Sequence, residues 1–461
     1  MKKLEYNSKL LIGLVVLVLV VITLTTRFHG STDIGDYADV AKYFAGEYSA
    51  DIRGSHSYLY GFIHAPFLSL TDSLVSFKIS SLLALLLIVY SVYWISNRDE
   101  KTLWLMLLSP VVWYMAPWIN PIQLSGLFLL WAWYFLRKFD ESNRLKDLLI
   151  SGVLVGLGWA VWDTILFFGA FLGLVFLWDK KFWNSLLFLL GVLAGLVPRL
   201  VLDQKIFGFA FYTIVKSFMG TLANIAGGIY GSVAGHTALT LTGLVLILLS
   251  IPVYYWKFYL AGDFNENRKT MIFLSLCLLL ILSNPQVRYI IALAPIMIVL
   301  VGKNINEKQF RVSLIVSVLV SLFFVAPYVA QALDDRPGIS VLIEDIAEIH
   351  SNETFVVGNA VDDYAFLARS YWGDGVAEFV SIQDYMAWES GNLVLLEKEW
   401  KLVPRIDDRR QIFISGGIQV NENDLTDYEN IKYAIGFKEP ISLEGFEVIA
   451  RSGALFVSEK K

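Results

Sequence analysis

Long uncharged apolar runs recur through the first 333 residues of this 461-residue chain. Each is close to the roughly 20 residues that a helix needs to cross a bilayer, and interfacial aromatic residues flank the shorter ones. The runs cover residues 10–26, 79–96, 102–117, 121–136, 148–162, 164–178, 185–198, 237–256, 270–286, 290–302 and 312–333. With 56% hydrophobic and 17% charged residues, the chain is too apolar for a soluble domain of its size. The sequence therefore predicts a polytopic α-helical membrane protein with about eleven transmembrane helices.

Lysine and arginine cluster on alternate connectors between these runs. The basic clusters lie at residues 2–9, 98–101, 137–146, 180–181, 257–269 and 303–311. Because basic residues mark cytoplasmic connectors, we expect the N-terminus in the cytoplasm and the C-terminal tail outside it, in a multi-pass protein of the cell membrane. The first run lacks a small-residue cleavage pattern, so we expect it to remain as an anchor.

Charge divides the chain into two predicted domains. Residues 334–461 contain 24 acidic and 12 basic residues, so they carry −12 while residues 1–333 carry +7. Within the acidic tail, residues 339–350 show helical spacing, and short strand patterns occur near residues 354–360, 391–397, 410–417, 432–437 and 454–459. We expect a transmembrane catalytic domain at 1–333 and a soluble extracytoplasmic α/β domain at 334–461. The single Cys277 excludes a disulfide within one chain.

The connector after the first run, residues 27–73, is unusually long and charged for a link between two spans. It contains apolar residues at helical spacing, namely Tyr37, Val40, Ala41, Phe44 and Ala45. This pattern predicts an amphipathic helix that lies along the membrane surface. Asp33 and Asp36 fall at its start, where helix amide groups stabilise negative charge.

This connector resembles the first outer loop of the GT-C glycosyltransferases, which include protein O-mannosyltransferases and aminoarabinose transferases. The resemblance is carried by Asp33, Tyr37, Ala38, Ala41, Gly46, Glu47, Tyr58, Tyr60, His64, Ala65 and Pro66. In that superfamily an acidic residue opens an interfacial helix, and a His-Pro-Pro-Leu-like segment leads to the next span. Here His64, Ala65, Pro66 and Phe67 match the second proline and not the first. A second likeness, to the Arg-Tyr start of a late span near the donor phosphate, involves Asn284, Pro285, Arg288, Tyr289 and Pro295.

The resemblance implies transfer of one sugar from a polyprenyl- or dolichyl-phosphate carrier to a lipid, glycan or protein acceptor on the outer face, with inversion. A carboxylate can take the proton of the acceptor hydroxyl, and cationic groups can stabilise the departing phosphate. The spacing to Tyr37 and Ala38 favours Asp33 as this base, while the Asp36–Tyr37 pair keeps Asp36 as a base or sugar contact. Either aspartate could instead only cap the helix.

Two arginines are candidates for binding the donor phosphate. Arg288, at the expected outer end of a span, can bind phosphate oxygens in a fork, or it could anchor that span at the interface. Tyr289 accompanies it in the Arg-Tyr pattern. Arg199 is expected to pair with Asp203, with phosphate binding as the alternative.

The remaining substrate-binding candidates are Asp163, His56, His64 and Tyr37. An acid at membrane depth such as Asp163 is a functional candidate, although a turn cap would explain it equally well. His56 and His64 could bind phosphate or shuttle protons, with interfacial packing as the alternative for His56. The aspartates and histidines could also hold a divalent metal, but no spacing requires one, and no cofactor is predicted with certainty.

The alternative from a different class is a transporter or flippase for a polar lipid or solute. A transporter would also place acids and an arginine near the membrane. The sequence has no internal repeat and no matching pair of interrupted half-helices, two features common in transporters. A scaffold subunit of a glycan-assembly complex is a third possibility.

Overall fold

A computed structural model describes most of the membrane part of the chain and the strands of its tail. The described residues are 6–26, 34–46, 57–68, 70, 73–215, 217–218, 245, 264–283, 287–302, 305–332, 354–358, 393–396, 399–402, 411–414, 418–421, 431–437, 445–452 and 455–461. The chain divides into two compact units. The first comprises Met1–Phe28, Lys78–Ala210 and Tyr230–Ala332, and the second comprises His29–Phe77, Phe211–Ile229 and Leu333–Lys461.

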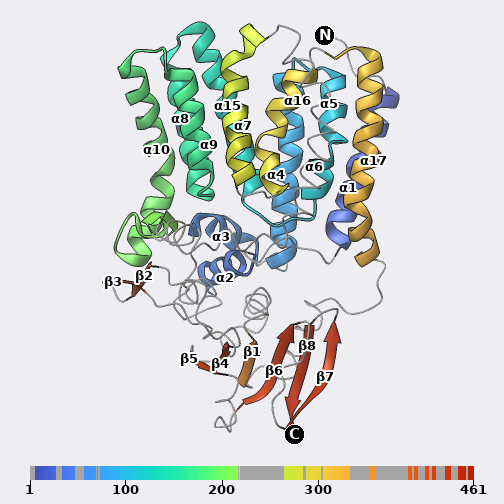
Figure 1. The fold of residues 1–461 in the computed structure, drawn as a ribbon, viewed down its shortest axis with the longest axis vertical. Coiled ribbons are helices and arrows are strands. Elements are labelled where there is room, and N and C mark those ends of the chain that lie inside the picture. The colour runs from blue at the N-terminus through green and yellow to red at the C-terminus, as the bar shows by residue number, and fades with distance from the viewer. Residues whose placement is uncertain are drawn as a thin grey trace. The chain divides into compact units, whose positions relative to one another are not determined.

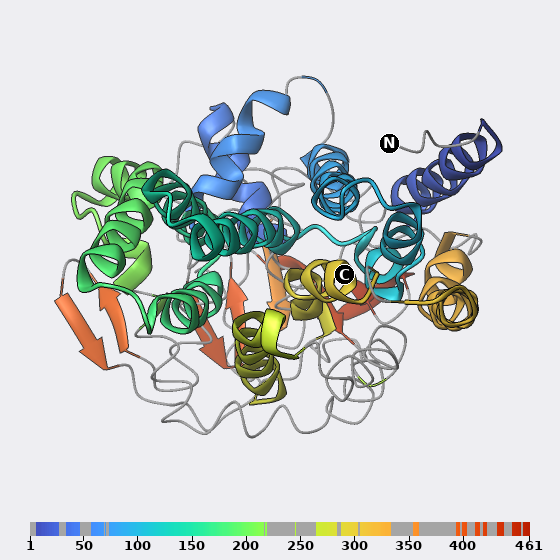
Figure 2. The same ribbon diagram turned by 90° about the horizontal axis from the view of Figure 1, so that it is seen from above.

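Helices dominate the first unit, and many of them run in nearly the same direction (Figure 1). They are α1 (Tyr6–Thr25), α4 (Ser73–Ile95, which begins in the second unit), α5 (Glu100–Leu107), α6 (Pro110–Met115), α7 (Ile122–Ser142), α8 (Leu145–Val161), α9 (Ile165–Leu177), α10 (Phe182–Phe207), α15 (Phe264–Ser283), η2 (Val287–Ala292), α16 (Ala294–Gly302) and α17 (Glu307–Ala332). Figure 2 shows α1, in dark blue, at the rim of this unit. Its leucines Leu10, Leu14 and Leu17 are more than half exposed, as expected of a helix that faces lipid.

Four of the described helices are long and apolar enough to cross a membrane, within Ser8–Thr25, Val75–Ile95, Phe182–Phe207 and Glu307–Ala326. The polytopic helical class predicted from the sequence is thereby confirmed. The apolar run at 102–117 forms two short helices, α5 and α6, because Pro110 has no backbone N–H and restricts the residue before it. The run at 290–302 likewise divides into η2 and the nine-residue α16, all of whose residues are buried.

Helices α8 and α10 of the first unit pack closely against each other, because glycines face each other across the contact. A Cβ added to Gly191 would lie 2.7 Å from the carbonyl oxygen of Leu149, and one added to Gly156 would overlap the carbonyl oxygen of Val192. Gly152 and Gly195 meet the opposite backbone in the same way. Such small-xxx-small spacing lets backbones approach where lipid offers no hydrophobic driving force.

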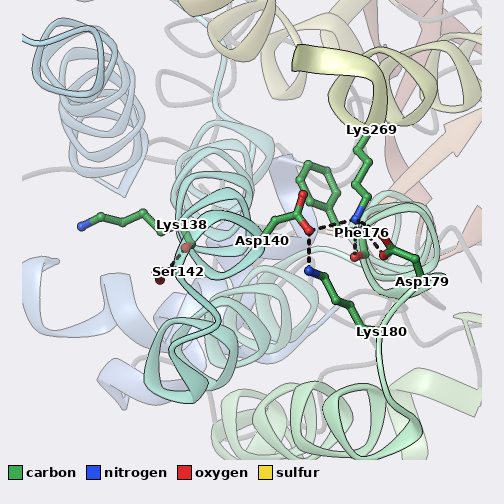
Figure 3. A network of polar contacts seen from close by, with 7 residues as sticks. All are labelled: Lys138, Asp140, Ser142, Phe176, Asp179, Lys180 and Lys269. Carbon is green, nitrogen blue, oxygen red and sulfur yellow. Dashed lines mark hydrogen bonds and ion pairs between the residues drawn. The ribbon is translucent and has the colours of Figure 1, made fainter. Parts of the chain in front are cut away.

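A polar network fastens α7, α15 and the end of α9 to one another (Figure 3). Lys269 Nζ donates to Asp140 Oδ1 at 2.8 Å, to Asp179 Oδ1 at 2.8 Å and to the carbonyl oxygen of Phe176 at 3.3 Å. Lys180 also pairs with Asp140, at 2.9 Å. The hydrogen bonds from Lys269 hold the pKa of Asp179 below its usual range. Although partial burial opposes it, the same contacts with Asp140 and Asp179 raise the pKa of Lys269.

In the second unit, the residues after 353 form two sheets. Six strands pair in the order β5-β4-β1-β6-β8-β7, and β2 (Leu393–Leu396) pairs with β3 (Glu399–Leu402). The six are β1 (Thr354–Gly358), β4 (Gln411–Ile414), β5 (Ile418–Asn421), β6 (Ile431–Phe437), β7 (Phe446–Ser452) and β8 (Leu455–Lys460). Within this sheet β1 and β6 are parallel and the other pairs antiparallel. The predicted strands are found, whereas the predicted helix at 339–350 lies outside the described residues. The division into domains at residue 333 stays a prediction.

The glycine contact between α8 and α10 predicts a specific sensitivity. Gly156→Ala should destabilise the detergent-solubilised protein by about 2 kcal/mol or more, because the methyl group must push two backbones apart. The measurement is the midpoint of thermal loss of the monodisperse peak in size-exclusion chromatography. Gly13→Ala on α1 is the matched control, since an added Cβ there meets nothing within 4 Å. Equal midpoints for both variants would contradict a tight contact.

Candidate functional site

The second unit contains the amphipathic helix predicted for the first connector. Helix α2 (Ile34–Ala45) buries Tyr37, Val40 and Ala41 of the predicted apolar face, whereas Phe44 is half-buried and Ala45 is exposed. It packs against α3 (Tyr58–His64), where the hydroxyl of Ser57 caps the first turn by accepting from the amide of Leu59 at 3.2 Å. Close packing requires Gly61, since an added Cβ would lie 2.6 Å from Val40 Cγ1. The ring of Tyr37 meets that of Tyr60 edge-on at 5.0 Å.

His64 closes α3 and is buried among aromatic rings. It stacks on Phe77 with ring centroids 4.0 Å apart and meets Tyr60 edge-on at 4.5 Å. Its Nδ1 lies 2.6 Å from the carbonyl oxygen of Tyr60, so the Nδ1–H tautomer donates there. Burial lowers the pKa of His64 to about 4, although this hydrogen bond opposes the shift. The imidazole is therefore neutral at pH 7, and its buried Nε2 is an acceptor with no partner in the described part of the chain.

In the first unit, the turn between α8 and α9 carries Asp163. Arg199, which follows the in-helix Pro198 of α10, holds this carboxylate in a fork, with Nη1–Oδ1 at 2.5 Å and Nη2–Oδ2 at 3.3 Å. Arg199 also donates to the carbonyl oxygen of Trp159 at 3.2 Å. The arginine is fully buried, whereas the Asp163 side chain is 24% exposed. This geometry favours a role for Arg199 in holding Asp163 in place, and the Asp163 side chain remains partly accessible.

Arg288 and Tyr289 lie on η2, close to the same turn. The guanidinium of Arg288 lies over the ring of Tyr289 at 5.7 Å, and Arg288 interacts electrostatically with Tyr114 of α6. The ring of Tyr289 lies 5.4 Å from that of Trp162, the residue before Asp163. Trp162 thereby joins the two arginine sites.

The sequence candidates thus fall into two groups. Asp163, Arg199, Arg288 and Tyr289 come together in the first unit, and Tyr37 and His64 come together in the second. Asp33 and His56 lie outside the described residues, and so does the side chain of Asp36, whose backbone is in the first turn of α2. The roles proposed for these three residues remain predictions.

The sequence did not single out Trp162 or the pairing of Asp163 with Arg199. Thirty-six positions separate these two residues in the chain, and no local pattern relates them. The partly exposed side chain of Asp163 can accept a hydrogen bond from a hydroxyl-rich ligand, and the guanidinium of Arg288 can bind an anion. Within the described ranges, no group of three His, Cys, Asp or Glu side chains is placed to hold a metal.

Comparisons with known proteins agree with this architecture. Two crystal structures of ArnT from Cupriavidus metallidurans are similar over nearly the whole chain, one bound to undecaprenyl phosphate and one in the apo state. Their TM-scores are 0.59 and 0.58, each at 13% sequence identity; they cover 99% and 98% of this chain, and 98% of the ArnT chain in both cases. No family model matches the sequence, and no curated protein matches it significantly. The chain therefore has an ArnT-like membrane fold, which agrees with the resemblance to aminoarabinose transferases seen in the sequence.

The buried pair of Asp163 and Arg199 makes a testable prediction about stability. Asp163→Asn should cost about 3–5 kcal/mol, because it removes a negative charge that the fully buried Arg199 guanidinium binds with two hydrogen bonds. Adding Arg199→Met should recover much of that loss, because the buried positive charge is then removed as well. Thermal midpoints of the single and double variants in detergent measure the coupling. Simple additivity of the two losses would contradict the pairing.

The lowered pKa of His64 predicts sensitivity to acid. Between pH 6.5 and 4 the unfolded chain binds a proton that the folded histidine does not, so stability is highest above pH 6.5 and falls as the pH drops. From pH 6.5 to pH 5 the loss should be about 2 kcal/mol. His64→Phe keeps an aromatic ring on Phe77 and should reduce this loss. Thermal midpoints of the protein and the variant at both pH values measure this loss. An equal loss in the variant would show that His64 is not its cause.

Proposed function

We propose that this protein is an inverting membrane glycosyltransferase. It moves one sugar from a polyprenyl- or dolichyl-phosphate donor to a lipid, glycan or protein acceptor at the outer face of the membrane. The observation that carries the proposal is the fold similarity, over 99% of this chain, to ArnT bound to undecaprenyl phosphate. ArnT's ligand supports a lipid phosphate donor here, and a polytopic fold provides the apolar surroundings that a polyprenyl tail requires.

The proposed chemistry is a single displacement at the anomeric carbon. Asp33 or Asp36 accepts the proton of the acceptor hydroxyl, whose oxygen forms the new glycosidic bond. The bond between the anomeric carbon and the phosphate oxygen breaks at the same time, and the lipid phosphate leaves with the bonding electrons. Because attack occurs opposite the leaving group, the configuration inverts. Arg288 stabilises the charge that develops on the phosphate.

Asp163, held by Arg199, is proposed to contact the substrate through its partly exposed side chain. His64 offers a neutral acceptor nitrogen that suits a hydroxyl better than a phosphate, because the ring carries no positive charge at pH 7. Tyr37 supports the α2–α3 contact on which the position of His64 depends.

The proposed orientation places the basic connectors in the cytoplasm and the tail outside. Contacts between those connectors support a common side: Lys269 joins the 137–146 and 180–181 connectors through Asp140 and Asp179, and Lys101 pairs with Glu307 at 3.2 Å. The count of about eleven spans and the extracytoplasmic α/β tail belong to the same proposal.

Substitution of the proposed base tests the reaction. Mass spectrometry of lipid carriers and surface glycans from a native-host strain should show, for Asp33→Asn or Asp36→Asn, accumulated polyprenyl-phosphate sugar and an acceptor lacking one residue. Arg288→Ala should lower transfer by roughly 100-fold, since one stabilising donor is lost. Glu141→Gln, which removes an exposed carboxylate paired only with Arg137 within the described region, is the control and should be silent.

Two results would count against transfer. Normal glycans in both aspartate variants, at normal expression, would remove the catalytic argument. Substrate flux in proteoliposomes that survives both substitutions would favour the transporter alternative instead.

A further inference from the structure

Lys78 is buried in the apolar helix α4, with 4% of its surface exposed. Its Nζ donates to the carbonyl oxygen of Thr26 at 2.5 Å, 52 residues earlier in the chain. Thr26 follows the last residue of α1, so its carbonyl is among those that a helix end leaves without an intrahelical partner. The ammonium therefore lies where the end of α1 meets the beginning of α4.

The charge of Lys78 has no acidic partner among the described residues. An ammonium carries three N–H donors, and the Thr26 carbonyl accepts one of them. Three other cations of the first unit have carboxylate partners: Arg199 pairs with Asp163, Lys180 with Asp140, and Lys269 with Asp140 and Asp179. Removing a charge from water without a counter-charge costs several kcal/mol, so a lysine kept at such a position is a candidate for binding an anion.

The position of Lys78 indicates which anion. The helices whose ends it joins are both long and apolar enough to span a membrane, and α1 exposes Leu14, Leu17 and Val21 at its surface. Lys78 is also an exception to the pattern in which lysine and arginine cluster on alternate connectors. It follows the connector at 27–73, which is not one of the basic connectors. A lipid phosphate fits this place, because its oxygens accept the two remaining N–H donors and its acyl or prenyl chains lie beside α1.

We propose that Lys78 is the cationic group of a binding site for a lipid phosphate at the junction of α1 and α4. The ligand is the phosphate of a polyprenyl carrier or of a bulk phospholipid. The site does not depend on the proposed transfer reaction, since either lipid would supply the missing counter-charge. The competing role for Lys78 is to cap the end of α1 through Thr26 alone.

Substitution to glutamine separates these roles. Lys78→Gln keeps an N–H donor for Thr26 and loses the charge, whereas Lys78→Arg keeps both. Native mass spectrometry of the full chain in detergent measures binding of undecaprenyl phosphate and, separately, of phosphatidylglycerol. Lys78→Gln should weaken binding at least tenfold and Lys78→Arg less than threefold. Lys138→Gln, which removes an exposed lysine from α7, is the control and should bind as the unsubstituted protein does.

The two lipids distinguish the sources of the phosphate. If Lys78→Gln weakens the binding of undecaprenyl phosphate alone, the site binds the polyprenyl carrier. If it weakens the binding of both lipids equally, the site binds membrane phospholipid. Unchanged binding of both lipids to Lys78→Gln overturns the site and leaves the helix cap.

If Lys78→Gln does not fold, Lys78→Met is a second variant, because its unbranched apolar side chain suits a buried position and carries no charge. Lys78→Met should weaken binding of the lipid at least tenfold in the same native mass spectrometry. Binding equal to that of the unsubstituted protein would overturn the proposal. Because neither experiment measures sugar transfer, failure of this site and failure of the proposed reaction can be told apart.

Discussion

The close approach of α8 and α10 is the contact on which the first unit's polar chemistry depends. Gly152 and Gly156 face Gly191 and Gly195, so the two backbones meet without intervening side chains. Beyond this contact along α10, Arg199 reaches the carbonyl oxygen of Trp159 on α8 and the carboxylate of Asp163. Larger residues at the glycine positions would move the guanidinium away from both acceptors. In a bilayer, where water cannot replace a lost partner, that separation would be costly.

Ion pairs, one of them buried, hold together much of the remaining arrangement. The first unit pairs Arg199 with one carboxylate and Lys269 with two, and the latter group joins elements that are far apart in sequence. Each pair recovers part of the desolvation cost through several charge-assisted hydrogen bonds. Lys78 has a single backbone acceptor in the described structure, and this difference separates a structural cation from a candidate ligand-binding one. The same reasoning applies to His64, which avoids the cost of burial by remaining neutral at pH 7.

Several elements could be predicted from local pattern. The spacing of Tyr37, Val40 and Ala41 predicted α2 and its buried face, because a helical period places these residues on one side. The tail strands followed from alternating apolar segments bounded by glycine and charge. Apolar length alone was less informative at 102–117, where Pro110 divides the run, and at 290–302, where η2 and α16 are short and buried.

By itself the sequence determined the class of protein, a polytopic helical membrane protein, and the residue types available for chemistry, because hydropathy and charge are properties of short segments. Only the tertiary structure decided which of those residues meet. Arg199 pairs with Asp163, which is 36 residues earlier in the sequence. Trp162 contacts Tyr289, a residue of η2 much later in the chain. The strand order that sets parallel β1 beside β6 is equally non-local. These pairings depend on how helices and strands pack, and packing is set by the shapes of surfaces that form only once the chain has folded.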